Sequence, residues 1–171
     1  KWNDELSKIT IESDKDRKVN FYTSMYHSFM NPIIYNDVNG EYRGLDQNIY
    51  KAQGFTNYTI FSLWDTYRAL HPLYTIIQQK RTNDIINSML AHFEQSVHKI
   101  LPTWSHYSNE NWCMIGYHAV PVIVDAYMKG FRNFDVKFLY KEMRKKALET
   151  PTEPRLAHAG RSGLEFYKNL G

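Results

Sequence analysis

Trp104-Ser-His-Tyr-Ser-Asn-Glu110-Asn-Trp112-Cys-Met-Ile-Gly-Tyr-His118 is the stretch on which the interpretation of this chain depends. It places the carboxylic acid of Glu110 in a polar turn between two tryptophans, directly before an apolar run. We expect residues 114–129 to form a buried helix, because the run is apolar on nearly all sides and Gly130 is a common helix stop. An acid beside indole rings suits a site that handles sugars, because an indole offers a large apolar face with a polar edge.

A second aromatic stretch, Phe61-Ser-Leu-Trp64-Asp65-Thr-Tyr67-Arg68-Ala-Leu-His71-Pro72, places another carboxylate beside a tryptophan. Asp65 and Arg68 lie three residues apart, so on a helix they share a face and can pair with each other. As a functional pair they could hold sugar hydroxyls, with Trp64 as the apolar wall. The alternative is that each is an ordinary buried or partly paired group.

Glu110 is the best candidate for a catalytic group. If a helix begins near Asn111, the free N–H groups at its N-terminus favour the carboxylate and lower the pKa of Glu110. Burial among tryptophans has the opposite effect and raises that pKa. A glycosidase general acid needs the second effect to dominate, so that the carboxyl stays protonated. The alternative is a plain capping carboxylate.

Composition narrows the functional classes. Of the 171 residues 15% are aromatic, including 13 tyrosines, which fits either a tyrosine-rich core or a binding surface. The net charge of +3 comes from scattered basic residues, so we do not expect nucleic-acid binding. The single cysteine excludes an intramolecular disulfide and a cysteine-rich zinc site, and the histidines follow no zinc motif. No apolar run reaches the roughly 20 residues of a membrane span.

Helical periodicity predicts further helices on both sides of the two stretches. They are expected at residues 19–30, 62–70, 72–79 and 82–99, from Asp135 onward, and after Gly160. A connector is expected at residues 150–154, and the turn signal Asn39-Gly40 predicts a hairpin or ordered loop within residues 33–60. Asp46 in that insertion is a weaker candidate for sugar binding. Paired helices of this length suggest an all-α fold of antiparallel hairpins arranged around a centre.

Four strings carry a resemblance to a known family: Phe21-Tyr-Thr23, Tyr42-Arg-Gly44, the stretch 61–72, and above all Asn109-Glu110-Asn-Trp112-Cys-Met-Ile-Gly116-Tyr-His118. The chain resembles glycoside hydrolase family 92, which comprises calcium-dependent, inverting exo-α-mannosidases. The resemblance implies an (α/α)6 barrel, or toroid, of helix pairs. Residues 1–171 would be one segment of this catalytic domain, with an N-terminal β-sandwich domain and the region of the catalytic base outside it.

The resemblance also assigns roles. Glu110 matches the general acid, Trp64 and Asp65 match positions that line the subsite for the terminal mannose, Arg68 supports them, and Trp112 is counted with the substrate-binding residues. The base aspartate and most calcium ligands would lie further along the polypeptide, so this segment should be inactive alone, and no residue of it is named as a metal ligand. The implied partners are a mannose-containing glycan and the remainder of the same polypeptide, in a periplasmic, cell-surface or secreted location.

Two other functions remain open. A relative could keep the aromatic cleft and bind glycans without catalysis, which a full-length sequence lacking the base aspartate would favour. A helical interaction module without a sugar site would require Trp64, Trp104 and Trp112 to be fully buried core residues.

Overall fold

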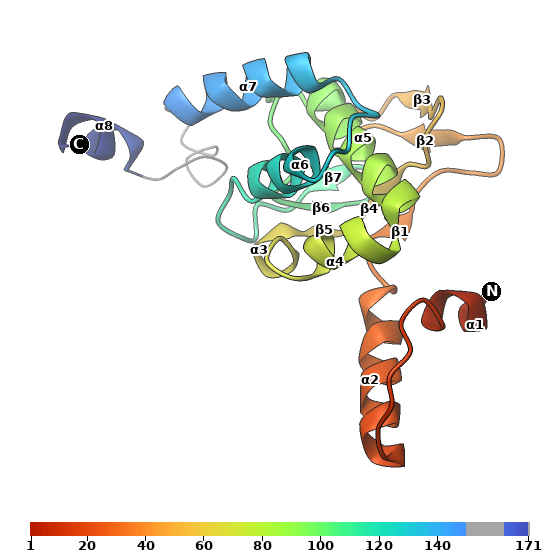
Figure 1. Ribbon diagram of the computed structural model, residues 1–171. Coiled ribbons are helices and arrows are strands. Elements are labelled where there is room, and N and C mark those ends of the chain that lie inside the picture. Colours follow the sequence, from red (N-terminus) through yellow and green to blue (C-terminus); the bar gives the residue numbers. More distant parts are fainter. Residues whose placement is uncertain (150–162, 171) are drawn as a thin grey trace.

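The computed structural model describes residues 1–149 and 163–170 (Figure 1), so the predicted connector at 150–154 lies outside these residues. The last short helix, predicted after Gly160, is found at Leu164–Leu170. The helices are α1 (Trp2–Leu6), α2 (Lys15–Ser28), α3 (Leu63–Thr66), α4 (Leu70–Ile77), α5 (Gln79–Gln95), α6 (Ala119–Met128), α7 (Val136–Leu148) and α8 (Leu164–Leu170). The strands are β1 (Ile33–Ile34), β2 (Glu41–Arg43), β3 (Ile49–Lys51), β4 (Tyr58–Thr59), β5 (Phe61–Ser62), β6 (Trp104–His106) and β7 (Asn109–Glu110).

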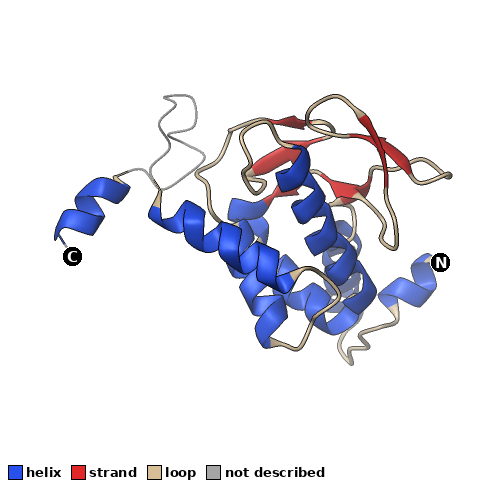
Figure 2. Ribbon diagram, turned by 90° about the horizontal axis from the view of Figure 1, so that it is seen from above, coloured by secondary structure: helices blue, strands red, loops and turns tan. Residues whose placement is uncertain are grey.

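The prediction of an all-α chain is wrong, because short strands accompany the helices. They form three antiparallel groups, β1 with β4, β2 with β3, and β5 with β6 and β7. Figure 2 shows these strands gathered along one side of the helices. Strands of two or three residues are too short for the alternation that identifies a strand, and two of the groups pair segments far apart in the sequence. Local periodicity therefore gave no signal for them.

The core lies where α4, α5 and α6 pack together. Tyr74, Ile86, Met89 and Ile123 are among its fully buried side chains. The helix predicted at residues 82–99 is confirmed as α5, with Ile86 and Met89 buried on one face, but the predicted bounds lie too late in the chain. The helix begins at Gln79 and ends at Gln95, before the exposed Val97.

Two aspartates start helices by accepting a backbone hydrogen bond. Asp135 accepts from the N–H of Phe138 at 2.9 Å, as the sequence predicts, and α7 follows. Asp14 accepts from the N–H of Arg17 at 2.9 Å, so α2 begins four residues before the predicted start. The apolar spacing of that helix starts one turn inside its true N-terminus, which explains the difference.

The helix predicted at residues 114–129 is shorter and less buried than expected. α6 covers Ala119–Met128, and Gly130 ends it with a φ of +97°. Ala119, Val122, Ile123 and Ala126 are buried, but Val124 and Met128 are exposed. In the part of the chain that the structure describes, one apolar face of α6 has no covering element.

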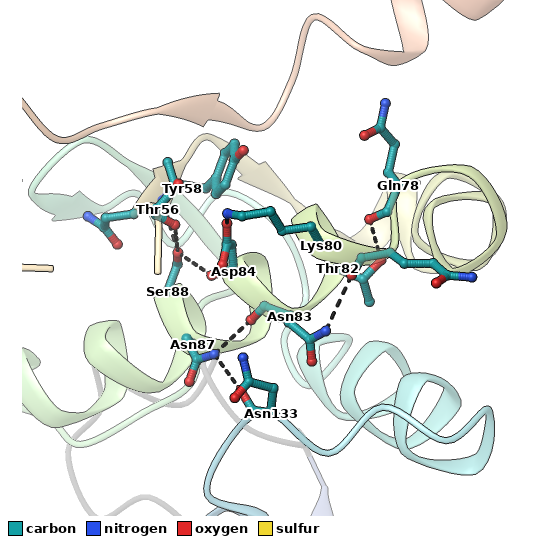
Figure 3. Close-up of polar contacts among 12 residues, drawn as sticks. Thr56, Tyr58, Gln78, Lys80, Thr82, Asn83, Asp84, Asn87, Ser88 and Asn133 are labelled. Atoms are coloured by element: carbon teal, nitrogen blue, oxygen red, sulfur yellow. Dashed lines mark hydrogen bonds and ion pairs between the residues drawn. The ribbon is translucent and has the colours of Figure 1, made fainter. Parts of the chain in front are cut away.

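The inserted hairpin within residues 33–60 is confirmed. β2 and β3 pair along Tyr42↔Tyr50, and the positive φ of Gly40 (+87°) forms the turn that leads into β2. β1 and β4 close the base of the insertion. Ser88 of α5 anchors it there, because its hydroxyl accepts from the N–H of Tyr58 at 2.9 Å and donates to the carbonyl of Asp84 at 2.7 Å (Figure 3).

The polar face of α5 also holds the segment that leads to α7. The amide of Asn87 donates to the carbonyl of Asn133 at 2.8 Å, and buried Asp84 pairs with Lys80 at 2.7 Å (Figure 3). Polar side chains of α5 therefore hold both the insertion and the segment before α7 in place. Among the described residues, no helix combines the length and apolar character needed to cross a membrane.

Candidate active site

The three-stranded group β5–β6–β7 brings the two aromatic stretches together. Ser62, two residues before Trp64, pairs with Trp104, and Ser105 pairs with Glu110. The rings of Tyr67 and His118 also lie 4.8 Å apart, so the stretches meet at a second place. Candidate residues separated by about 45 positions in the sequence therefore share one small region of the fold.

Glu110 lies on β7 with its side chain 4% exposed. Its Oε1 accepts from the N–H of Trp104 at 2.8 Å and from that of Trp112 at 3.3 Å. Its Oε2 accepts from the N–H of Thr103 at 3.0 Å and lies 3.6 Å from Nε2 of His92 on α5. The carboxyl group is thus fixed by the backbone on three sides and faces a histidine on the fourth.

Burial raises the pKa of Glu110 above its ordinary value, and the backbone N–H groups of Thr103, Trp104 and Trp112 oppose that rise without cancelling it. The neighbouring His92 is fully buried, and burial lowers its pKa to about 3. His92 is therefore neutral near pH 7. A carboxyl with a raised pKa beside an uncharged imidazole is an environment in which a protonated acid is favoured.

The expected helix start near Asn111 is wrong. Trp112 has a φ of +56°, in the left-handed region, and a right-handed helix cannot run through such a residue. The first turn of α6 begins only at Ala119. The donors that we expected from a helix N-terminus come instead from the end of the preceding loop, from β6 and from Trp112 itself. Burial still raises the pKa of Glu110, which is the direction expected of a general acid.

The other candidate carboxylate, Asp65, is exposed on α3. Its Oδ2 accepts from the hydroxyl of Ser62 at 2.6 Å. The expected pairing of Asp65 with Arg68 is not found, because Arg68 instead donates to the carbonyl of Trp64 at 2.9 Å. Its guanidinium lies 5.5 Å from the centre of the Trp64 ring and 5.1 Å from that of Tyr67. Arg68 therefore packs against Trp64 and does not pair with Asp65.

The tryptophans of the site are all at least partly accessible. Trp64 is 40% exposed, while Trp104 and Trp112 are half-buried, and the ring of Trp112 lies 5.9 Å from that of His98. The interaction-module hypothesis required all three to be core residues, and they are not. The weaker candidate, Asp46, accepts from the hydroxyl of Tyr50 at 2.6 Å and so serves the hairpin itself.

Comparison with known proteins identifies the family. The model of the glycosyl hydrolase family 92 catalytic domain matches residues 1–171. The chain belongs to glycoside hydrolase family 92. Its match spans the whole sequence, including Glu110 and Asp65.

Solved structures of family 92 share the fold of this segment. The α-mannosidase BT3965 from Bacteroides thetaiotaomicron is 52% identical over 90% of this chain, with a TM-score of 0.85, and has also been solved in complex with mannoimidazole. The inverting mannosidase BT2199 from Bacteroides thetaiotaomicron is 28% identical over 99% of the chain, with a TM-score of 0.85. The chain spans 21% and 23% of the lengths of these two relatives. A comparison with curated protein sequences gave no match.

The resemblance to family 92 implies calcium, and the described part of this segment does not fit a calcium site. Calcium takes six to eight oxygen ligands, roughly, with carboxylates prominent among them. Within residues 1–149 and 163–170, no three histidine, cysteine or acidic side chains come together to hold a metal ion. No chemical step of this segment is therefore assigned to a metal.

Sequence reasoning missed His92. The histidines follow no zinc motif, so the sequence predicted no role for His92. Its position beside Glu110 depends on the packing of α5 against β6 and β7, which no local pattern reveals. The one available signal was a polar residue within the apolar stripe of an otherwise regular helix.

Proposed function

We propose that this chain is a segment of an inverting exo-α-mannosidase that hydrolyses terminal α-linked mannose from mannose-rich glycans. Membership of family 92 supports the proposal, and so do the α-mannosidases among its solved relatives. The observation that carries it is the buried Glu110, whose pKa burial raises although three backbone N–H groups bind it.

In this proposal Glu110 is the general acid. It gives its proton to the glycosidic oxygen as the bond to the anomeric carbon breaks, so the departing sugar leaves as an alcohol. A base carboxylate takes a proton from the water that attacks the opposite face of the ring. In inverting enzymes the two carboxyl groups stand about 6.5–9.5 Å apart to admit this water. We place the base aspartate, and most ligands of a calcium ion, in the remainder of the polypeptide.

The exposed group formed by Trp64, Asp65 and Arg68 is proposed to bind the terminal mannose. Trp64 offers an apolar face 40% exposed to solvent, which suits the apolar side of a sugar ring. Asp65 offers a carboxylate held by Ser62 through one oxygen, with the other free for a sugar hydroxyl. Trp112, next but one to Glu110, would contact the substrate on the acid's side of the site.

The helices of this segment are proposed to form part of an (α/α)6 toroid that other segments complete. α4 and α5 form an adjacent pair, and α6 packs on both. The face of α6 that carries Val124 and Met128 is exposed in this segment, as expected for a helix that a further helix of the same polypeptide covers.

Hydrolysis by the full-length protein tests this function. We expect release of mannose from an α-mannobiose, with proton NMR detecting β-mannose as the first product, because inversion of an α-linkage yields the β-anomer. Calcium chelation should stop release. Formation of α-mannose first would exclude an inverting mechanism, and the absence of any hydrolysis would exclude the enzyme.

A glycan-binding protein without catalysis is the second candidate. It is favoured by the three N–H groups around Glu110, which also suit a buried structural carboxylate. Binding of α-mannobiose without hydrolysis by the full-length protein would select this function over the first.

A further inference from the structure

His92 and Glu110 face each other from different elements, α5 and β7. Nε2 of His92 lies 3.6 Å from Oε2 of Glu110, and the two side chains are 5% and 4% exposed. Within the part of the chain that the structure describes, this Nε2 is buried without a hydrogen-bond partner. An unpartnered buried nitrogen costs free energy, and here it is placed against the candidate acid.

The backbone groups that contact the Glu110 carboxyl cannot change their hydrogen-bonding role. The N–H groups of Thr103, Trp104 and Trp112 can only donate, whatever the charge of Glu110. A neutral imidazole presents Nε2 either as a donor or as an acceptor, according to its tautomer. Among these four neighbours, His92 is the one whose role can reverse when the carboxyl gains or loses its proton.

The surroundings keep His92 neutral while Glu110 titrates. Burial lowers the pKa of His92 to about 3, and burial is also the largest influence on the pKa of Glu110. His92 also lines a small cavity of about 20 Å³ beneath the inserted hairpin. The other titratable or charged side chains around this cavity are Tyr35, Tyr42, Arg43, Tyr58 and Tyr107.

We propose that His92 is a positioning residue for Glu110 and donates Nε2–H to Oε2 as the carboxyl gives its proton to the leaving oxygen. The proposal rests on the acid role of Glu110 proposed above. A hydrogen bond to a charged oxygen is about twice as strong as one between neutral groups. His92 therefore stabilises the carboxylate that develops in the transition state more than the neutral acid. It also limits how far burial raises the pKa of Glu110.

The test replaces His92 in the full-length enzyme with leucine, which cannot donate, and with glutamine, whose amide can. We expect His92→Leu to lower kcat/KM for an α-mannobiose by roughly 10- to 100-fold, because a hydrogen bond to a charged group is lost. The basic limb of the kcat/KM profile should move upward by about one pH unit, since the carboxylate loses a donor. His92→Gln should restore most of the rate and the position of the limb.

His71 provides a matched control, because it is also buried and its Nε2 also lacks a hydrogen-bond partner among the described residues, but it lies on α4. His71→Leu should leave the basic limb in place, and melting curves will show that each variant is folded. His92→Phe takes the place of His92→Leu if the latter does not fold. An unmoved or lowered limb in the folded variant overturns the proposal, and so does an equal shift in His71→Leu.

The two proposals fail in different ways. If Glu110→Gln lowers the rate equally for good and poor leaving groups, Glu110 is not the acid and both proposals fall. If Glu110→Gln shows the leaving-group dependence of an acid while His92→Leu behaves as wild type, only the role of His92 is rejected.

Discussion

Glu110 and Asp65 are both carboxylates close to a tryptophan, and both lie on or beside the same three-stranded group. Glu110 is buried and is bound by backbone N–H groups from two segments, whereas Asp65 is exposed and held by the hydroxyl of its near neighbour Ser62. The fold determines the surroundings of the first, and local sequence determines those of the second. A change at Glu110 should therefore affect stability and chemistry together, and a change at Asp65 should affect binding alone.

Acidification should cause the largest loss of stability, and the loss should come from buried histidines. Burial lowers the pKa of His71 to about 4 and that of His92 to about 3. An unfolded histidine titrates near about 6.5, so below that pH the unfolded state binds more protons than the folded state. The stability that these two buried, neutral histidines contribute is present above about pH 6.5 and is lost as the pH falls toward their pKa values in the folded state. The Tm of the full-length protein should therefore fall in this range.

A variant of His92 tests the cause in the same measurement. His92→Gln should weaken the fall of Tm on acidification, because it removes a buried neutral histidine. Glu110 acts with the opposite sign, since its raised pKa supports stability below its unfolded value and loses that support as pH rises through the folded value. An identical pH dependence of Tm in His92→Gln and wild type would contradict the buried, neutral state of His92.

The next largest effect is expected at Asp65. Asp65→Ala removes a carboxylate that is proposed to bind sugar hydroxyls, and kcat/KM for an α-mannobiose should fall by roughly 100-fold or more. Its Tm should stay close to that of wild type, because an exposed substitution away from the core changes stability by roughly 0.5 kcal/mol or less. Steady-state kinetics and melting curves measure the two quantities. Unchanged kinetics, or a large loss of Tm, would make Asp65 a structural residue.

Truncation of Glu110 should lower stability as well as activity. Glu110→Ala leaves the N–H groups of Thr103 and Trp104 without their partner, and an unsatisfied buried donor costs roughly 1–3 kcal/mol. We expect a loss of about 2–5 kcal/mol in the free energy of unfolding of this region, measured by chemical denaturation of the full-length protein. A loss no greater than that of Asp65→Ala would remove the distinction between the two carboxylates.

The smallest effect is expected at Arg68. Its contact with the Trp64 ring, 5.5 Å from the ring centre, is partly exposed and is worth about 0.5–1 kcal/mol. Arg68→Met should therefore raise KM by roughly two- to fivefold and leave kcat unchanged, whereas Arg68→Lys should have a weaker effect. A change in kcat with KM unaltered would place Arg68 in the chemistry rather than in support of Trp64.

The sequence predicted what local patterns determine. The cap at Asp135, the stop at Gly130 and the turn at Gly40 each depend on a residue and its immediate neighbours, and each was found. The strand that carries Glu110 was not foreseen, because β7 has two residues and exists by pairing with Ser105. The positive φ of Trp112, which prevents a helix there, also has no local signal.

The candidate site was predictable to a similar extent. The sequence draws attention to Trp64, Asp65 and Glu110 by residue type. All three also lie in stretches that resemble family 92. The separate contacts of Asp65 with Ser62 and of Arg68 with Trp64 could not be distinguished from a mutual ion pair on spacing alone. The sequence could not predict that His92 lies beside Glu110, because the two residues are 18 positions apart and tertiary packing brings them together.

The leaving-group dependence of Glu110→Gln tests the central claim most directly. General-acid catalysis contributes about 10²- to 10⁴-fold, and it is needed only where the leaving alcohol is poor. In the full-length enzyme we therefore predict a loss of that size in kcat/KM on an α-mannobiose and little loss on an activated aryl mannoside. Equal losses on the two substrates would contradict the assignment of Glu110 as the acid.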